Sequence, residues 1–142
     1  MKISLNRIND EYLFECINSL GNTILLDNTS HSENSRGVSP METVLMAVAG
    51  CSGIDMVSIL KKQRQEITGF RAEVTGDRIQ VDEAKPFKTI LVQFFVEGTI
   101  DPKKAERAAG LSFEKYCSVS KTFEPNITVN YDVYVNGEKV TG

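Results

Sequence analysis

One long apolar segment near the middle of the chain constrains the fold most. It follows Ser39 and Pro40, passes through the run LMAVAGC and ends in the polar run KKQRQ. Ser39 is a preferred N-cap residue, Pro40 suits the first helical position, and Glu42 completes an S-x-x-E capping box. These features predict a helix from Ser39 to about Arg64. Because residues 44–51 are apolar on every side, we expect the N-terminal half to be buried all round.

Short strands and a second helix surround this segment. We expect a meander of strands over 2–28, a polar loop over 27–39, strands over 69–81 and 87–98, a helix over 101–117 and a strand over 127–135. Because the strands come in runs, the pattern favours an α+β fold with antiparallel or mixed sheets. The length of 142 residues predicts a single domain, residues 1–142.

Composition excludes several classes of protein. The chain has 16 Lys and Arg against 19 Asp and Glu, and the two signs are interspersed. We therefore expect no nucleic-acid partner. We also expect no membrane partner, because no apolar run reaches the length of a span. The N-terminus lacks the apolar core of a signal peptide, so we expect a cytoplasmic protein.

The three cysteines are the main candidates for chemistry. Cys16, Cys51 and Cys117 form no C-x-x-C motif, and His31 is the single histidine. The metal ligands are thus too few and too scattered along the chain, and we expect no metal site. Cys16 is interpreted as a small apolar residue within a strand.

Cys51 and Cys117 are the candidate catalytic residues. They lie 66 positions apart, one on each predicted helix, and could meet in the fold. A thiolate that attacks a peroxide becomes a sulfenic acid, which a second thiol can resolve as a disulfide. Ala47, Gly50 and Gly53 recur every third residue beside Cys51. This spacing indicates either close helix packing or room for a substrate.

Ionisation of Cys51 needs help from outside its own helix. The thiol lies roughly 18 Å from the helix start, and the helix dipole acts only within the first turn. Asp55, one turn later on the same face, opposes a second negative charge. The candidate activating cations are Arg36 and Arg7, whereas Lys115 and Lys121 flank Cys117.

A second copy of the chain is expected to complete the fold. Two helices on one sheet face would not bury a helix that is apolar on all sides. We therefore expect a homodimer, in which a second protomer covers the remainder.

The sequence resembles the OsmC-like superfamily, which includes the organic hydroperoxide resistance (Ohr) proteins. The resemblance rests on SPMETVLMAVAGCSGIDMVSILKKQRQ followed by EKYCSVSKTF, and it is strongest to the YhfA-like branch. It implies an α+β fold of two intertwined protomers with active sites at the dimer interface. It also implies that Cys51 is peroxidatic, that Cys117 resolves it, and that organic hydroperoxides are the substrates. Lipoyl-type dithiols would recycle the disulfide, and no bound cofactor is implied.

Two features of Ohr enzymes are missing. Their central helix opens with Asn-Pro-Glu, and that Glu position falls on Met41 here, with Glu42 one residue later. Their catalytic Arg lies in a Gly-Gly-Arg turn, where this chain reads RINDEY. The alternative function is therefore a non-enzymatic protein that binds an apolar or electrophilic small molecule on the same fold.

Overall fold

The chain divides into two compact units. The computed structural model describes residues 1–30 and 33–140, so His31 lies outside the described residues. Met1–Val44 form the first unit and Leu45–Gly142 the second. Helix α1 (Pro40–Lys62) begins in the first unit and continues through the second. The single domain expected from the length stays a prediction.

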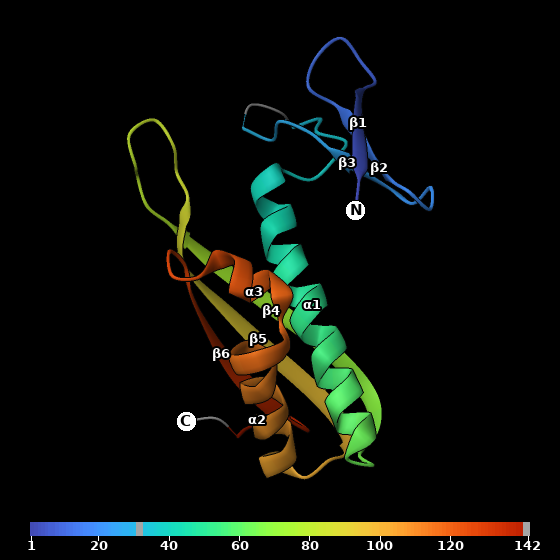
Figure 1. Ribbon diagram of the computed structural model, residues 1–142, viewed down its shortest axis with the longest axis vertical. Coiled ribbons are helices and arrows are strands. Elements are labelled where there is room, and N and C mark those ends of the chain that lie inside the picture. Colours follow the sequence, from blue (N-terminus) through green and yellow to red (C-terminus); the bar gives the residue numbers. More distant parts are fainter. Residues whose placement is uncertain (31–32, 141–142) are drawn as a thin grey trace. The chain divides into compact units, whose positions relative to one another are not determined.

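An antiparallel sheet forms most of the first unit. Its strands, in order across the sheet, are β1 (Ile3–Arg7), β2 (Phe14–Asn18) and β3 (Thr23–Leu26). Figure 1 shows these strands in blue. Leu5 pairs with Cys16, and Cys16 pairs with Ile24, so these three residues share one face. The expected meander is confirmed.

The loop after β3 returns along the sheet and leads into α1. The Val38 N–H donates to the Leu25 carbonyl at 3.1 Å, and the Asp27 N–H donates to the Val38 carbonyl at 3.0 Å. The predicted capping box then forms. The Ser39 N–H donates to Glu42 Oε2 at 2.8 Å, and the Glu42 N–H donates to Ser39 Oγ at 3.2 Å.

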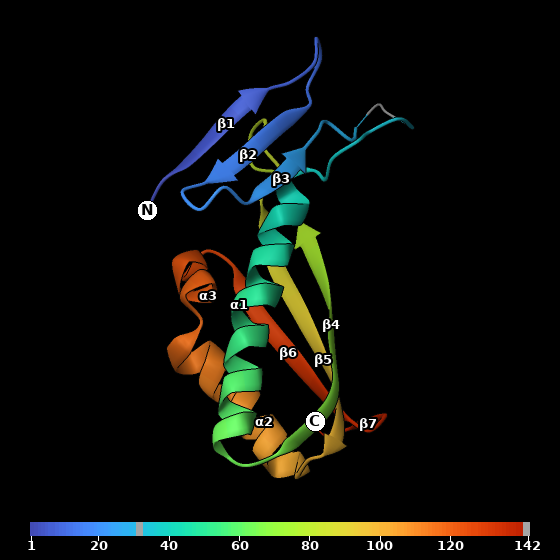
Figure 2. The same cartoon turned by 90° about the vertical axis from the view of Figure 1, so that its right-hand side faces the viewer.

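A mixed sheet and the helices form the second unit. The strands, in order, are β4 (Glu66–Arg78), β5 (Phe87–Thr99), β6 (Thr128–Val135) and β7 (Glu138–Lys139). β4 and β7 are antiparallel to their neighbours, whereas β5 and β6 run parallel. The helices of this unit lie on one face of the sheet (Figures 1 and 2).

The region predicted as one helix over 101–117 consists of separate elements. These are α2 (Pro102–Leu111), the π-helical turn η1 (Ser112–Tyr116) and, beyond it, α3 (Ser118–Phe123). Asp101 caps α2 as predicted, accepting from the Lys103 N–H at 2.9 Å. The Cys117 N–H donates to the Ser112 carbonyl at 2.7 Å, which closes the π turn. The single-helix prediction is wrong because an apolar stripe does not reveal one widened turn.

Alternating residues of β5 form the core against which the helices pack. The inward-facing members are Ile90, Val92, Phe94 and Val96. Phe94 contacts Phe70 of β4, with ring centroids 6.0 Å apart, and Phe113 of η1, with centroids 6.1 Å apart. Phe113 therefore attaches the π turn to the sheet.

Helix α1 is buried on one side only. Its buried residues are Val48, Ser52, Gly53, Met56 and Leu60. On the other side, Met46 is 53% exposed and Ile54 is 69% exposed. One sheet face covers only one side of a helix, as expected from the sequence for a single chain, and burial of the other side by a second protomer stays a prediction. The small residues predicted to form one stripe have different surroundings. A side chain at Gly53 would meet Phe70, whereas one at Gly50 would extend into open space.

By length and composition alone, α1 could also span a membrane. Its most apolar window has a mean hydropathy of 1.8. The expectation that no apolar run reaches this length is wrong, because α1 contains a window of 18 residues with at most two charged side chains. Within the chain, one side of this helix packs on the second unit, where Gly53 lies beside Phe70.

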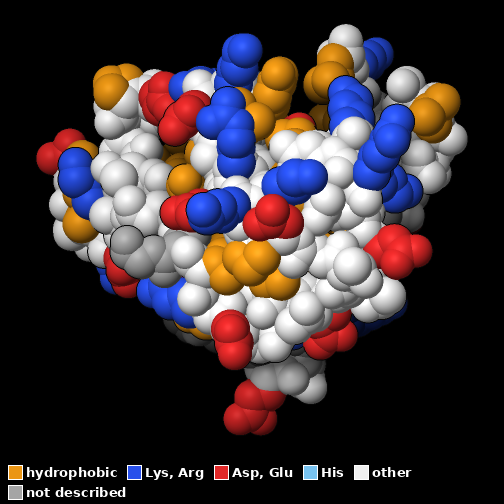
Figure 3. Space-filling model, turned by 90° about the horizontal axis from the view of Figure 1, so that it is seen from below, with side chains coloured by type: hydrophobic (Ala, Val, Ile, Leu, Met, Phe, Trp, Pro, Cys, Tyr) orange, Lys and Arg blue, Asp and Glu red, His pale blue; other side chains and the backbone are white. Residues whose placement is uncertain are grey.

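Charged side chains of both signs intermingle on the face seen in Figure 3. Ion pairs between neighbouring side chains include Arg71 with Glu73 at 2.8 Å and Lys139 with Asp132 at 3.2 Å.

Candidate functional site

Two of the functional side chains project from one side of α1. Cys51 and Asp55 are four residues apart, which places them one helical turn apart on the same side. Both residues are half-buried. The predicted position of the carboxylate next to the thiol is confirmed.

The second thiol comes from the junction of η1 and α3. Cys117 is 0% exposed and has an extended backbone between the two helical elements. Its sulfur accepts a hydrogen bond from the Ser120 N–H at 3.5 Å, and its carbonyl accepts from Ser120 Oγ at 3.1 Å. Ser120 thus contacts both the thiol and the carbonyl of Cys117.

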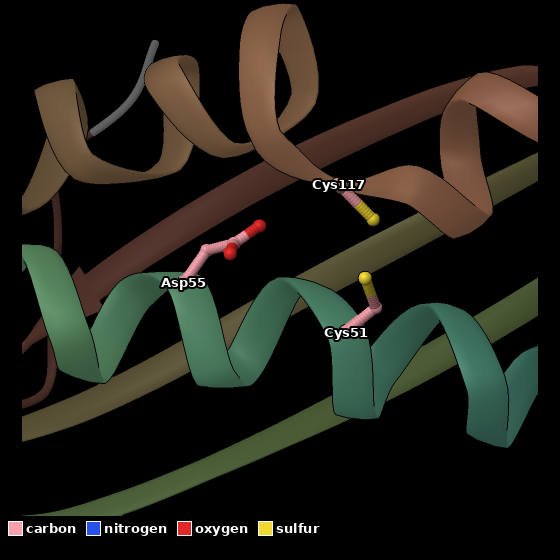
Figure 4. Close-up of side chains that lie close together, drawn as sticks. All are labelled: Cys51, Asp55 and Cys117. Atoms are coloured by element: carbon pink, nitrogen blue, oxygen red, sulfur yellow. The ribbon is translucent and has the colours of Figure 1, made fainter.

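The three groups converge in the second unit. The Cys51 sulfur, the Cys117 sulfur and a carboxylate oxygen of Asp55 lie within 4.8 Å of one another. Figure 4 shows both thiols and the carboxylate directed into the space between α1 and the η1–α3 junction. All three cysteines are free thiols, and Cys16 lies on β2 of the first unit, where the sequence predicts it. The structure therefore brings Cys51 and Cys117 together, as hypothesised from the sequence.

Burial raises the pKa of the Cys117 thiol above its ordinary value. Hydrogen bonds from Ser120 oppose this increase, and the neighbouring Cys51 thiol adds to it. A raised pKa keeps the Cys117 thiol protonated near neutral pH. Cys117 is therefore poorly suited to begin a nucleophilic attack on a peroxide.

A buried serine, which the sequence analysis did not identify, fixes the carboxylate. Ser112 is 0% exposed, and its hydroxyl donates to Asp55 Oδ2 at 2.8 Å. Ser120, the partner of Cys117, was missed as well. The contact of Ser112 leaves no sequence signal, because it forms only when the π turn brings Ser112 over α1. The contacts of Ser120 with Cys117 are local, three residues apart at the start of α3, where Cys117 acts as the N-cap.

Of the two candidate activating cations in the first unit, Arg7 has local partners for its side chain, whereas the recorded contact of Arg36 is made by its backbone. Arg7 Nε donates to the Glu11 carbonyl at 2.9 Å, and the Arg7 terminal nitrogen donates to the Asp10 carbonyl. Arg36 donates its backbone N–H to Asp27 Oδ2 at 3.0 Å. Arg7 is thus committed to the turn after β1, and its role in activating Cys51 stays a prediction, as does that of Arg36.

The two lysines that flank Cys117 also have contacts elsewhere. Lys121 pairs with Glu124 at 3.2 Å, and the Lys115 amine lies 5.7 Å from the centre of the Tyr116 ring. Both contacts are local surface contacts of the kind that solvated charges make. Neither lysine is assigned a part in the chemistry.

A groove of about 430 Å³ leads to the carboxylate. It is lined by Asp55, Ser58, Ile59, Lys62, Gln63, Leu111 and Tyr116. The lining combines the apolar side chains of Ile59, Leu111 and Tyr116 with polar groups from the end of α1. The groove can therefore receive a partly apolar molecule beside Asp55.

Comparison with known proteins identifies the family. The family model described as OsmC, OsmC-like protein, matches residues 31–132, which is well over half of the chain. The chain belongs to the OsmC-like protein family. Protein YhfA of Escherichia coli strain K12 is 44% identical over 117 residues, covering 80% of this chain and 84% of YhfA. The resemblance to the YhfA-like branch is thereby confirmed.

Solved structures of the OsmC-like fold match nearly the whole chain. A hypothetical protein from Aquifex aeolicus VF5 has a TM-score of 0.78 and 29% identity, covering 95% of this chain and 96% of that one. The organic hydroperoxide resistance protein OhrB of Bacillus subtilis has a TM-score of 0.65 and 19% identity, covering 94% and 96%. The expected α+β OsmC-like fold is confirmed, and the likeness to OhrB is one of fold.

Proposed function

We propose that this OsmC-like protein reduces organic hydroperoxides with Cys51 as the peroxidatic thiol and Cys117 as the resolving thiol. The observation that carries the proposal is the placement of two free thiols and a carboxylate within 4.8 Å of one another. The name of the B. subtilis relative, an organic hydroperoxide resistance protein, agrees with this chemistry.

The proposed reaction has two steps in the protein. The Cys51 thiolate attacks the distal oxygen of the hydroperoxide, so a sulfur–oxygen bond forms, the oxygen–oxygen bond breaks and the alkoxide leaves as the alcohol after protonation. Cys117 then attacks the Cys51 sulfenic acid, forming the disulfide and releasing water. We assign the proton that Cys117 loses to the Asp55 carboxylate, which has an oxygen within 4.8 Å of both sulfurs.

Burial supports this division of roles. Cys51 is half-buried and can be reached by a substrate, whereas Cys117 is 0% exposed. The raised pKa of Cys117 further disfavours it as the attacking group. Closing the disulfide requires the sulfurs to approach to about 2.05 Å, a movement that side-chain rotation on two separate elements can provide.

The groove beside Asp55 supports an organic substrate. Ile59, Leu111 and Tyr116 offer apolar surface for the alkyl part of a hydroperoxide. Two electrons from an external dithiol, of the lipoyl type or similar, then return the disulfide to two thiols. That reductant would bind transiently and not as a resident cofactor.

We further propose that the protein acts as a homodimer. Met46 and Ile54 leave an apolar side of α1 open, and Ile3, Leu5 and Ile24 are each at least half exposed on the sheet of the first unit. A three-stranded sheet with so much exposed apolar surface needs a covering partner. Sedimentation should give a dimer, and Ile54→Glu should shift it toward monomer. A monomeric wild type at working concentration would refute this proposal.

The peroxidase proposal is tested by comparing single cysteine variants. With cumene hydroperoxide and dihydrolipoamide, Cys51→Ser should lose turnover. Cys117→Ser should still consume one equivalent of hydroperoxide but accumulate sulfenic acid at Cys51, because no second thiol is present to resolve it. Mass spectrometry of the oxidised wild type should find the Cys51–Cys117 bridge.

Cys16→Ser is the matched control, because it removes a half-buried thiol from the other unit. It should react like the wild type. If Cys51→Ser reduced the hydroperoxide as fast as the wild type, the peroxidase proposal would fail. The non-enzymatic binding protein would then be the better description.

A further inference from the structure

The side chains of Cys51, Cys117 and Asp55 form a cluster of three groups that can each carry a negative charge. When both thiols ionise, three negative charges lie within 4.8 Å of one another. Among the described residues, the recorded ion pairs join Arg71 to Glu73, Lys121 to Glu124 and Lys139 to Asp132, all outside this cluster. A divalent cation between the three groups would compensate their charge.

The types of ligand atom select a particular class of metal. Thiolate sulfur favours soft or borderline cations such as Zn²⁺, whereas Mg²⁺ and Ca²⁺ prefer oxygen ligands. Tetrahedral zinc holds thiolate sulfur at about 2.3 Å and carboxylate oxygen at about 2.0–2.2 Å, so its ligand atoms lie roughly 3.4–3.8 Å apart. The observed spread of up to 4.8 Å therefore needs to contract by only about 1 Å.

The surrounding contacts prepare these groups to bind an ion. Cys51 and Asp55, one turn apart on α1, form a chelating pair on a rigid element. Ser112 donates to Asp55 Oδ2, and among the described residues no recorded hydrogen bond engages the other carboxylate oxygen. The Ser120 N–H orients the Cys117 sulfur. Partners of this kind orient metal ligands and commonly change metal affinity 10–100-fold when they are removed, as a rough guide.

We propose that Cys51, Asp55 and Cys117 of the reduced protein bind one Zn²⁺ ion. Three protein ligands leave a fourth position for water or an external thiol, as in zinc sites that are not purely structural. The sequence predicted no metal site because these residues are widely separated along the chain. The fold brings them together from α1 and the η1–α3 junction, as Figure 4 shows.

Zinc binding and disulfide formation exclude each other. Two thiolates, one hydroperoxide and two protons give the disulfide, the alcohol and water, and the zinc ion then loses both sulfur ligands and is released. This consequence rests on the proposed peroxidase activity. The metal site itself does not, because it needs only the reduced cluster.

The test uses Co²⁺ as a spectroscopic probe for zinc. Reduced, metal-free full-length protein is titrated with Co²⁺ without oxygen. Thiolate-to-cobalt charge-transfer absorption should saturate at one ion per chain and disappear when Zn²⁺ is added. Zinc affinity, measured by competition with a chromophoric chelator, should fall about 10–100-fold in Ser112→Ala and at least as far in Asp55→Asn.

Matched variants keep the result clear. Cys16→Ser should bind cobalt like the wild type, whereas Cys51→Ser and Cys117→Ser should lose the charge-transfer band. Asp55→Asn keeps the shape of the side chain, and circular dichroism confirms that each variant folds. In the wild type, zinc should protect only Cys51 and Cys117 from alkylation.

No charge-transfer band in the wild type, or a band that persists unchanged in Cys51→Ser and Cys117→Ser, would overturn the metal site. The titration contains no hydroperoxide. A failure of the metal site would therefore leave the peroxidase proposal standing, and loss of the peroxidase proposal would leave the metal site standing.

Discussion

Replacing Ser112 by alanine should destabilise the protein through a single lost hydrogen bond. The buried Ser112 hydroxyl donates to the Asp55 carboxylate at 2.8 Å. Hydrogen bonds to charged groups contribute about 1.5–3 kcal/mol. Asp55 is half-buried and lines a groove that water can enter, so we expect the low end, about 1.5 kcal/mol. For a chain of 142 residues this corresponds to a fall in Tm of about 5 °C.

Thermal unfolding followed by circular dichroism measures this loss, and a double-mutant cycle with Asp55→Ala assigns it to the contact. The two substitutions should show a coupling free energy of about 1 kcal/mol. Ser58→Ala, which removes an exposed hydroxyl from the same groove, should change stability by no more than about 0.5 kcal/mol. The reasoning would be refuted if Ser112→Ala left the Tm unchanged. It would also be refuted if Ser112→Ala lowered stability equally in the wild type and in the Asp55→Ala variant.

Further predictions concern packing and pH. Gly53→Ala should raise the free energy of unfolding by about 0.5–1 kcal/mol, because alanine favours the helix and its Cβ would meet Phe70 at an ordinary 3.5 Å. Gly76→Ala should lower it by about 1–3 kcal/mol, because its Cβ would lie 2.4 Å from the Phe87 ring. Urea unfolding of both variants measures these changes. A Gly76→Ala variant more stable than Gly53→Ala would contradict both predictions. Burial and two nearby glutamates raise the pKa of Tyr131, so stability should fall as the pH rises above about 10. Tyr131→Phe should reduce this alkaline loss of urea midpoint, and identical losses in both proteins would count against the cause given.

Local signals in the sequence were enough for much of the fold. The start of α1 was predictable because Ser39 and Glu42 cap each other through groups three residues apart. β5 was predictable because its buried residues alternate strictly from Ile90 to Val96. Both features depend only on residues close together in the sequence, so contacts with distant parts of the chain do not alter them.

Features that depend on distant contacts could not be predicted in this way. The π turn leaves no mark on the apolar pattern, and α3 and β7 are too short to show a clear period. The two cysteines could be named as a pair, but the hydroxyl that holds Asp55 could not. Ser112 meets α1 where the next residue, Phe113, packs against Phe94 of the sheet, and both contacts join residues far apart in the sequence.

Ser112 contacts both Cys117 and Asp55 and so connects the two elements that carry the site. Its carbonyl accepts from the Cys117 N–H at 2.7 Å, and its hydroxyl reaches Asp55. Adding or deleting one residue between Ser112 and Cys117 would turn the following chain by about 100° and break one link or the other. The arrangement of Cys51, Asp55 and Cys117 therefore requires a fixed number of residues in this turn as strictly as it requires the two cysteines. An OsmC-like chain could lose its working thiol pair there while keeping every cysteine in its sequence.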